Sequence, residues 1–179
     1  MNNLYLDLIC EHQILSEEFI LNNEEDLNWD IIGQYQKLSE SFFEDNESNL
    51  EILEYSLNNE ISEDFFKYNI EWIDINDALS KNKYSEDFFI SNISNFDSDD
   101  WYVISEYQNL SEEFMEQNRD KLYFDKIYQY QSLSEEFIEK YRDFITKKQW
   151  DYISQNDFIT EEFIDKYKDE LNWVLISKK

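Results

Sequence analysis

A hydroxyl residue followed by glutamate recurs along the chain, and apolar residues follow it at fixed distances toward the C-terminus. Phenylalanine lies three residues after each hydroxyl residue, and a large apolar residue lies four residues after it. Such regular self-similarity is typical of proteins built from tandem structural repeats. The seven hydroxyl residues, separated by 23 or 26 positions, are Ser16, Ser39, Ser62, Ser85, Ser111, Ser134 and Thr160.

The beginning of each repeat has the pattern of a helix N-terminus. Serine or threonine at the N-cap accepts a hydrogen bond from a free amide of the first turn. The acidic residues that follow complement the positive end of the helix dipole. An apolar residue before the hydroxyl, such as Leu15 or Leu38, can pack across the cap. We therefore predict that a short helix begins just after each hydroxyl residue.

The second half of each repeat predicts another short helix. A large apolar residue such as Trp29 is followed three residues later by a second one such as Ile32, which places both on one helix face. The two longer repeats gain three residues, close to one helical turn, before Trp101 and Trp150. Polar residues suited to capping precede most of these segments, namely Asn28, Asp74, Asp97, Thr146 and Asn172.

Residues 1–15 match the second helix of a repeat, because Leu6 and Ile9 occupy the register of Trp29 and Ile32. We predict an all-α fold, a right-handed-type α-solenoid of about seven two-helix repeats preceded by this N-terminal half repeat. Residues 1–179 are expected to form a single repeat domain. Its repeats would begin near residues 16, 39, 62, 85, 111, 134 and 160.

The composition agrees with a helical fold. Proline is absent, Gly33 is the only glycine, and aromatic residues make up 18% of the chain, which suffices for a core. A single cysteine, Cys10, fits a reducing compartment. The N-terminus lacks the pattern of a signal peptide, and no apolar stretch approaches the length of a membrane helix. We expect a soluble cytoplasmic protein, in the host cytoplasm if its source is a phage or a virus.

The repeat consensus runs Leu-Ser-Glu-Glu-Phe-Ile, then Leu-Asn-Trp-Asp and Ile-Ser-Gln-Tyr-Gln. It resembles the tandem helical repeats of uncharacterised proteins from giant viruses, phages and AT-rich microbes. The best local matches are Leu15–Ile20 with Leu27–Gln36, Leu133–Tyr141 and Ile159–Trp173, and repeats two and three depart from the consensus in their second helices. The resemblance implies the repeat architecture and no activity.

Few residues of the sequence are candidates for catalysis or metal binding. His12, the only histidine, shares the register of Tyr35, Tyr107 and Tyr130, so we predict a repeat-packing role for it. Cys10 aligns with small residues and has no basic neighbour that would make it reactive. The sequence contains no zinc-binding cluster, calcium loop or phosphate-binding glycine loop. The glutamate pairs recur at every helix start, which is typical of a scaffold. We predict no metal, no cofactor and no enzymatic activity.

Charge is distributed unevenly along the repeats. Residues 1–110 hold 26 acidic and 4 basic side chains, whereas residues 111–179 hold 16 acidic and 11 basic ones. Because both parts share one repeat, the fold does not require this difference in charge. A high density of acidic side chains also destabilises a compact chain, because like charges repel one another. Base composition and solubility are one explanation of the acidic surplus. The other is a basic partner surface, which the acidic part would bind.

Stacked repeats place equivalent residues in rows, so the helix-start acids should form an acidic row with further carboxylates nearby. This surface could imitate a polyanion, whereas direct binding of nucleic acid is disfavoured because it needs a basic patch. The leading hypothesis is a phage- or virus-type inhibitor that occupies the basic nucleic-acid-binding surface of a host defence nuclease, such as a CRISPR effector. The alternative is a general protein–protein interaction scaffold. The candidate partner-binding residues are Glu17, Glu18, Glu24, Glu25, Asp26, Asp30, Glu40, Glu44, Asp45, Glu47, Glu63, Asp64, Glu86 and Asp87.

Overall fold

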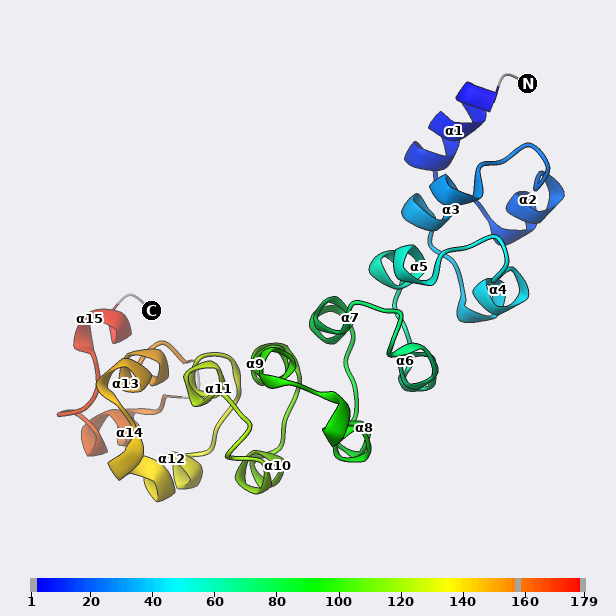
Figure 1. The fold of residues 1–179 in the computed structure, drawn as a ribbon. Helices are drawn as coiled ribbons and strands as arrows, with labels where there is room; N and C mark the ends of the chain where they lie inside the picture. The colour runs from blue at the N-terminus through cyan, green and yellow to red at the C-terminus, as the bar shows by residue number, and fades with distance from the viewer. Residues whose placement is uncertain (1–2, 157–158, 178–179) are drawn as a thin grey trace. The chain divides into compact units, whose positions relative to one another are not determined.

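The computed structural model describes residues 3–156 and 159–177, and these contain helices and no strand. Helix α1 (Asn3–His12) is the predicted half repeat, and a pair of helices follows in every repeat (Figure 1). The pairs are α2 (Glu17–Asn22) and α3 (Trp29–Tyr35), α4 (Glu40–Asp45) and α5 (Ile52–Asn58), α6 (Glu63–Asn69) and α7 (Ile75–Lys81), α8 (Glu86–Ser91) and α9 (Ser98–Tyr107), α10 (Glu112–Gln117) and α11 (Phe124–Tyr130), α12 (Glu135–Tyr141) and α13 (Lys147–Ile153), and α14 (Glu161–Lys166) and α15 (Trp173–Ile176). The predicted all-α fold and its repeat pattern are confirmed.

The helices begin where the capping residues stand. In each repeat the hydroxyl oxygen accepts a hydrogen bond from the backbone N–H of the phenylalanine three residues later, at 3.0–3.2 Å. Asn28, Asp74, Asp97, Thr146 and Asn172 cap the second helices of their repeats, as predicted. These local bonds satisfy amides that the helix itself leaves without acceptors.

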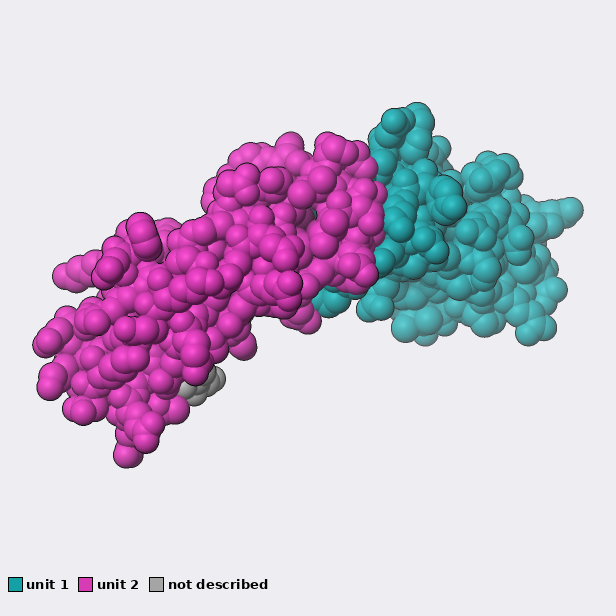
Figure 2. All heavy atoms as spheres, turned by 90° about the horizontal axis from the view of Figure 1, so that it is seen from below, with its two compact units in different colours: residues 1–84 teal, residues 85–179 magenta. Residues whose placement is uncertain are grey.

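The chain folds as two compact units, unit 1 (residues 1–84) and unit 2 (residues 85–179), which are coloured separately in Figure 2. The boundary falls immediately before the N-cap Ser85, so it separates whole repeats. In unit 1 the second helices α3, α5 and α7 pack in order beside α1, and in unit 2 α11 packs between α9 and α13. The first helices of each unit form a separate row (Figure 1).

The core of each unit lies between these two rows. The paired apolar residues of the first helices, such as Phe65 and Phe66, are buried. In the second helices the anchors Trp101 and Trp150 are buried, whereas the equivalent anchors of the shorter repeats, such as Trp29, are half-buried or exposed. At the N-terminal end Phe19 is 40% exposed, although its equivalents in the other repeats are buried.

The two longer repeats differ from the others between their helices. Each contains a 3-10 turn, η1 (Ile93–Asn95) or η2 (Arg142–Phe144), after its first helix. The inserted residues then form an additional first turn of the second helix, ahead of the buried anchors Trp101 and Trp150. This placement keeps the buried face in register, as the insertion of about one helical turn predicts.

Candidate functional site

The glutamate directly after the N-cap residue can form hydrogen bonds with the N-cap residue of the next repeat. Oε1 of Glu17 accepts a hydrogen bond from the backbone N–H of Ser39 at 2.6 Å. Glu40 accepts one from the N–H of Ser62 at 2.5 Å and another from its hydroxyl at 2.8 Å. In unit 2 Glu86 makes the same pair of bonds to Ser111, and Glu112 makes them to Ser134.

This arrangement changes the predicted acidic row. The first acids, Glu17, Glu40 and Glu63 in unit 1 and Glu86 in unit 2, are half-buried at the helix starts. In unit 1 the exposed part of the row consists of the second acids Glu18 and Asp64, and in unit 2 Asp87 is exposed at the same repeat position. Repeat two has Ser41 instead, and Asp64 lies 3.8 Å from the ammonium group of Lys67. The helix-start row of unit 1 is therefore interrupted at Ser41, and its first acids Glu17 and Glu40 have a structural role in joining repeats.

A second set of bonds between repeats uses buried amides, which the sequence interpretation missed. The Gln36 side chain accepts a hydrogen bond from Leu15 N–H at 2.8 Å and donates to the carbonyl oxygens of Cys10 and Gln13. Asn59, Asn82 and Gln131 likewise each accept a bond from the backbone N–H of the residue just before the hydroxyl that begins their own repeat. The recurrence of amides at this register, as Gln36, Asn59, Asn82, Gln108 and Gln131, was the available sequence signal.

The densest carboxylates of unit 1 lie at the other end of its first helices, in the turns that lead to the second helices. We call these turns the turn edge of unit 1. A six-residue helix is about 9 Å long, so the turn edge is distinct from the helix-start row. Glu44 and Asp45 border it at the end of α4, and Asp30 lies in the first turn of α3. The turn edge comprises residues 23–28, 46–51 and 69–74, with the exposed acids Glu24, Glu25, Asp26, Glu47, Glu51, Glu71 and Asp74.

The same turns carry a different charge in the two units. The turn edge of unit 1 has seven acidic residues and no lysine or arginine. The equivalent turns of unit 2 include Arg119, Lys121, Arg142 and Lys168. There Lys121 pairs with Asp120 at 3.2 Å, and Arg142 pairs with Glu170. The repeat fold therefore accommodates lysine and arginine in this turn, although the turn edge of unit 1 contains neither.

The acidic surface of unit 1 also affects its core. Tyr55 is fully buried and donates a hydrogen bond from its hydroxyl to the carbonyl oxygen of Leu38 at 3.4 Å. Burial raises the pKa of Tyr55, and the nearby carboxylates of Glu40, Glu17 and Glu44 raise this pKa further. The negative field of the surface thus disfavours additional negative charge within unit 1.

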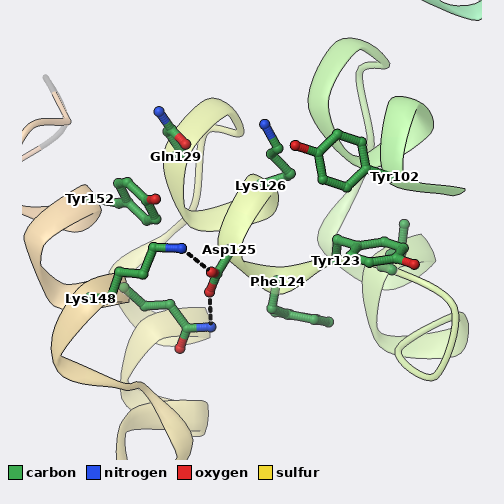
Figure 3. Close-up of a pocket in the computed structure, with 10 residues that line it drawn as sticks. Tyr102, Tyr123, Phe124, Asp125, Lys126, Gln129, Lys148 and Tyr152 are labelled. Atoms are coloured by element: carbon green, nitrogen blue, oxygen red, sulfur yellow. Dashed lines mark hydrogen bonds and ion pairs between the residues drawn. The ribbon is translucent and has the colours of Figure 1, made fainter. Parts of the chain in front are cut away.

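Unit 2 contains a second candidate site, a hollow of about 470 Å³ on the second helices (Figure 3). Tyrosines from three successive repeats line it, together with lysine, glutamine and aspartate side chains. Among them, the rings of Tyr102 and Tyr123 meet edge to face with their centroids 5.3 Å apart. The lining residues are Tyr102, Leu122, Tyr123, Phe124, Asp125, Lys126, Gln129, Lys148, Gln149 and Tyr152.

Both lysines of this hollow are paired with carboxylates of neighbouring residues. Lys126 Nζ lies 2.6 Å from a carboxylate oxygen of Glu106 and 4.5 Å from the centre of the Tyr102 ring. Lys148 Nζ lies 2.6 Å from Asp125, a contact drawn in Figure 3. The hydrogen bond from Lys148 is the main cause of the lowered pKa of Asp125. The hollow therefore offers tyrosine surface and little net charge.

The remaining candidate side chains show no catalytic arrangement. His12 is exposed, with 70% of its side chain accessible, and Tyr35, Tyr107 and Tyr130 in its register are also exposed. The predicted packing role of His12 is therefore wrong, because this register faces outward. Cys10 is buried at the small-residue position, and burial is the main cause of its raised pKa, which disfavours the reactive thiolate.

Metal ligation and membrane insertion find no support in the described residues. Within that part of the chain, no three His, Cys, Asp or Glu side chains are placed to hold a metal ion together. None of the described helices has both the length and the apolar character needed to cross a membrane. No family model, curated protein or solved structure matches the chain.

Proposed function

We propose that this chain is a non-enzymatic acidic binding protein whose unit 1 docks onto a basic protein surface that normally binds nucleic acid. The observation that carries the proposal is the turn edge of unit 1, where seven exposed acids occur without a cation in turns that accept cations in unit 2. At the helix starts Glu17 and Glu40 have a structural role in joining repeats, and at the turn edge Asp74 caps α7. The other turn-edge acids are exposed like charges that repel one another. A basic partner would relieve this repulsion.

The target that we propose is the nucleic-acid-binding channel of a host defence nuclease, such as a CRISPR effector. Such a channel presents lysine and arginine to phosphates, and regularly spaced carboxylates can occupy the same groups. Inhibition would then be competitive, because the acidic surface and the nucleic acid need the same cations. Electrostatic attraction would mainly speed the encounter, and buried contacts would determine the lifetime of the complex.

A pull-down from host lysate tests this function when it is washed at low and at high salt. Native protein should retain a basic nucleic-acid-binding protein at low salt and lose much of it at high salt, because exposed charges are screened. A variant in which Glu24, Glu25 and Asp26 are all changed to lysine should lose the partner. Equal retention by this variant would contradict the proposed role of the turn edge.

A general interaction scaffold is the second candidate function, and the tyrosine-lined hollow of unit 2 favours it. Tyr102 and Tyr123 are partly exposed, and tyrosine is enriched among residues that dominate protein–protein affinity. Binding at this hollow would depend little on salt, since Lys126 and Lys148 are already paired. A partner that is lost on the change Tyr102→Ala and retained at high salt would support this function over the acidic one.

A further inference from the structure

Trp72 occupies an unusual position on the turn edge of unit 1. It lies between α6 and α7, and 64% of the residue is exposed. The neighbouring Ile73 is buried and supplies the apolar contact that ends the first half of the repeat. The equivalent positions in the two preceding repeats hold Asp26 and Asn49. The fold of unit 1 therefore does not require an indole at this position.

Trp72 is one of the residues that line a shallow hollow of about 520 Å³, which we call the Trp72 hollow. Phe43 and Leu50, both buried, line it from the core, and the exposed acids Glu47 and Glu51 line it from the turn edge. All of these residues belong to unit 1. An exposed tryptophan, buried apolar residues and two acidic residues therefore line one shallow hollow.

Glu51 provides an independent indication that this hollow is not explained by the stability of the fold. It is the N-cap residue of α5, but its side chain makes no capping hydrogen bond. In the repeats on either side, Asn28 and Asp74 occupy the same position and do cap their helices. Glutamate is a poorer cap than these shorter side chains, so its presence here is unfavourable for α5.

We propose that the Trp72 hollow binds an arginine side chain of the basic partner, an inference that rests on the function proposed above. A guanidinium group is planar, stacks on an indole and can donate parallel hydrogen bonds to a carboxylate. Its aliphatic stem suits the lining by Phe43 and Leu50. A lysine ammonium group is more strongly hydrated and lacks the flat face, so it fits less well. An anionic group would be repelled by Glu47 and Glu51.

The experiment compares an oligo-arginine and an oligo-lysine peptide of equal length, titrated into the full chain by calorimetry. Native protein should bind the arginine peptide about two- to fivefold more tightly than the lysine peptide, the range expected for an exposed cation–π contact. The change Trp72→Leu, which keeps an apolar side chain, should remove this difference. Phe144 is the matched control, because it has the same repeat position in unit 2 and is 74% exposed. Phe144→Leu should leave the preference unchanged.

Removal of charge gives a second control. The double change Glu47→Gln and Glu51→Gln should weaken binding of the arginine peptide more than Glu18→Gln with Asp64→Asn, which removes equal charge from the helix-start row. Circular dichroism of each variant checks that the helices persist. A preference for arginine that survives Trp72→Leu overturns the inference. Equal, salt-sensitive binding of both peptides to native protein overturns the inference alone, whereas no binding of either peptide also contradicts the proposed function.

Discussion

The carboxylate of Glu40 accepts hydrogen bonds from both the backbone N–H and the hydroxyl of Ser62, the N-cap residue of the following repeat. The same oxygen of Ser62 caps helix α6, so one side chain ties the start of α4 to the start of α6. Glu40 therefore connects two repeats, and Glu17, Glu86 and Glu112 bond in the same way to the N-cap residues that follow them. Only the acids without such a task remain as candidates for binding a partner.

The change Glu40→Gln tests the structural role of this connection. It removes the charge that strengthens two hydrogen bonds, and we expect the free energy of unfolding to fall by about 1 kcal/mol because the site is partly exposed. Urea-induced unfolding followed by circular dichroism measures the change. Asp64→Asn is the control, because it removes one charge from an exposed position of the same row. Equal effects of the two changes would show that the connection contributes nothing.

The buried amide of Gln36 should contribute more than an exposed residue of the same type. The change Gln36→Leu leaves Leu15 N–H and two carbonyl oxygens without their partner, and we expect a loss of about 1–3 kcal/mol. Hydrogen exchange at the Leu15 amide should also become faster. Gln34 is exposed in α3, the helix that Gln36 caps at its C-terminus, and supplies the control Gln34→Leu. An unchanged Leu15 exchange rate would rule out this role of the amide.

Alkaline pH should destabilise unit 2 through a buried phenol. Burial is the main cause that raises the pKa of Tyr128 to about 12. The ordinary pKa of tyrosine is about 10, so the folded chain holds the proton more tightly than the unfolded chain. This contribution to stability is fully present below about pH 10 and is lost as the pH rises toward 12. Urea unfolding across this range should show the loss, and Tyr128→Phe should reduce it.

The sequence predicted local features of the fold well. The caps at Ser16, Asn28 and Asp97 were found because a capping side chain bonds to amides only two or three residues away. Because the same signals recur in every repeat, the helix pairs were predicted correctly. The insertion of about one helical turn was expected to keep the buried face of the longer repeats, and the anchors Trp101 and Trp150 are buried. Phe19 is exposed although it shares the repeat pattern of six buried phenylalanines, so the pattern alone does not determine burial.

The candidate site was predicted less completely, because it depends on contacts between repeats. Glu17 and Glu40 were predicted as exposed binding residues, and their bonds to residues 22 positions later were not anticipated. The turn-edge acids Glu24, Glu25 and Asp26 were identified from charge density alone. Trp72 was missed because its position is not occupied by the same residue type in other repeats, and the sequence interpretation relied on residues that recur.

The most direct test of the proposed function measures competition for the partner that the pull-down retains. A labelled oligonucleotide is bound to this partner, and its release is followed by fluorescence polarisation as native protein or the lysine variant of Glu24, Glu25 and Asp26 is added. We predict that native protein releases the oligonucleotide at low salt, that high salt weakens this release, and that the variant releases little. Binding of native protein to the partner without release of the oligonucleotide would contradict the proposal.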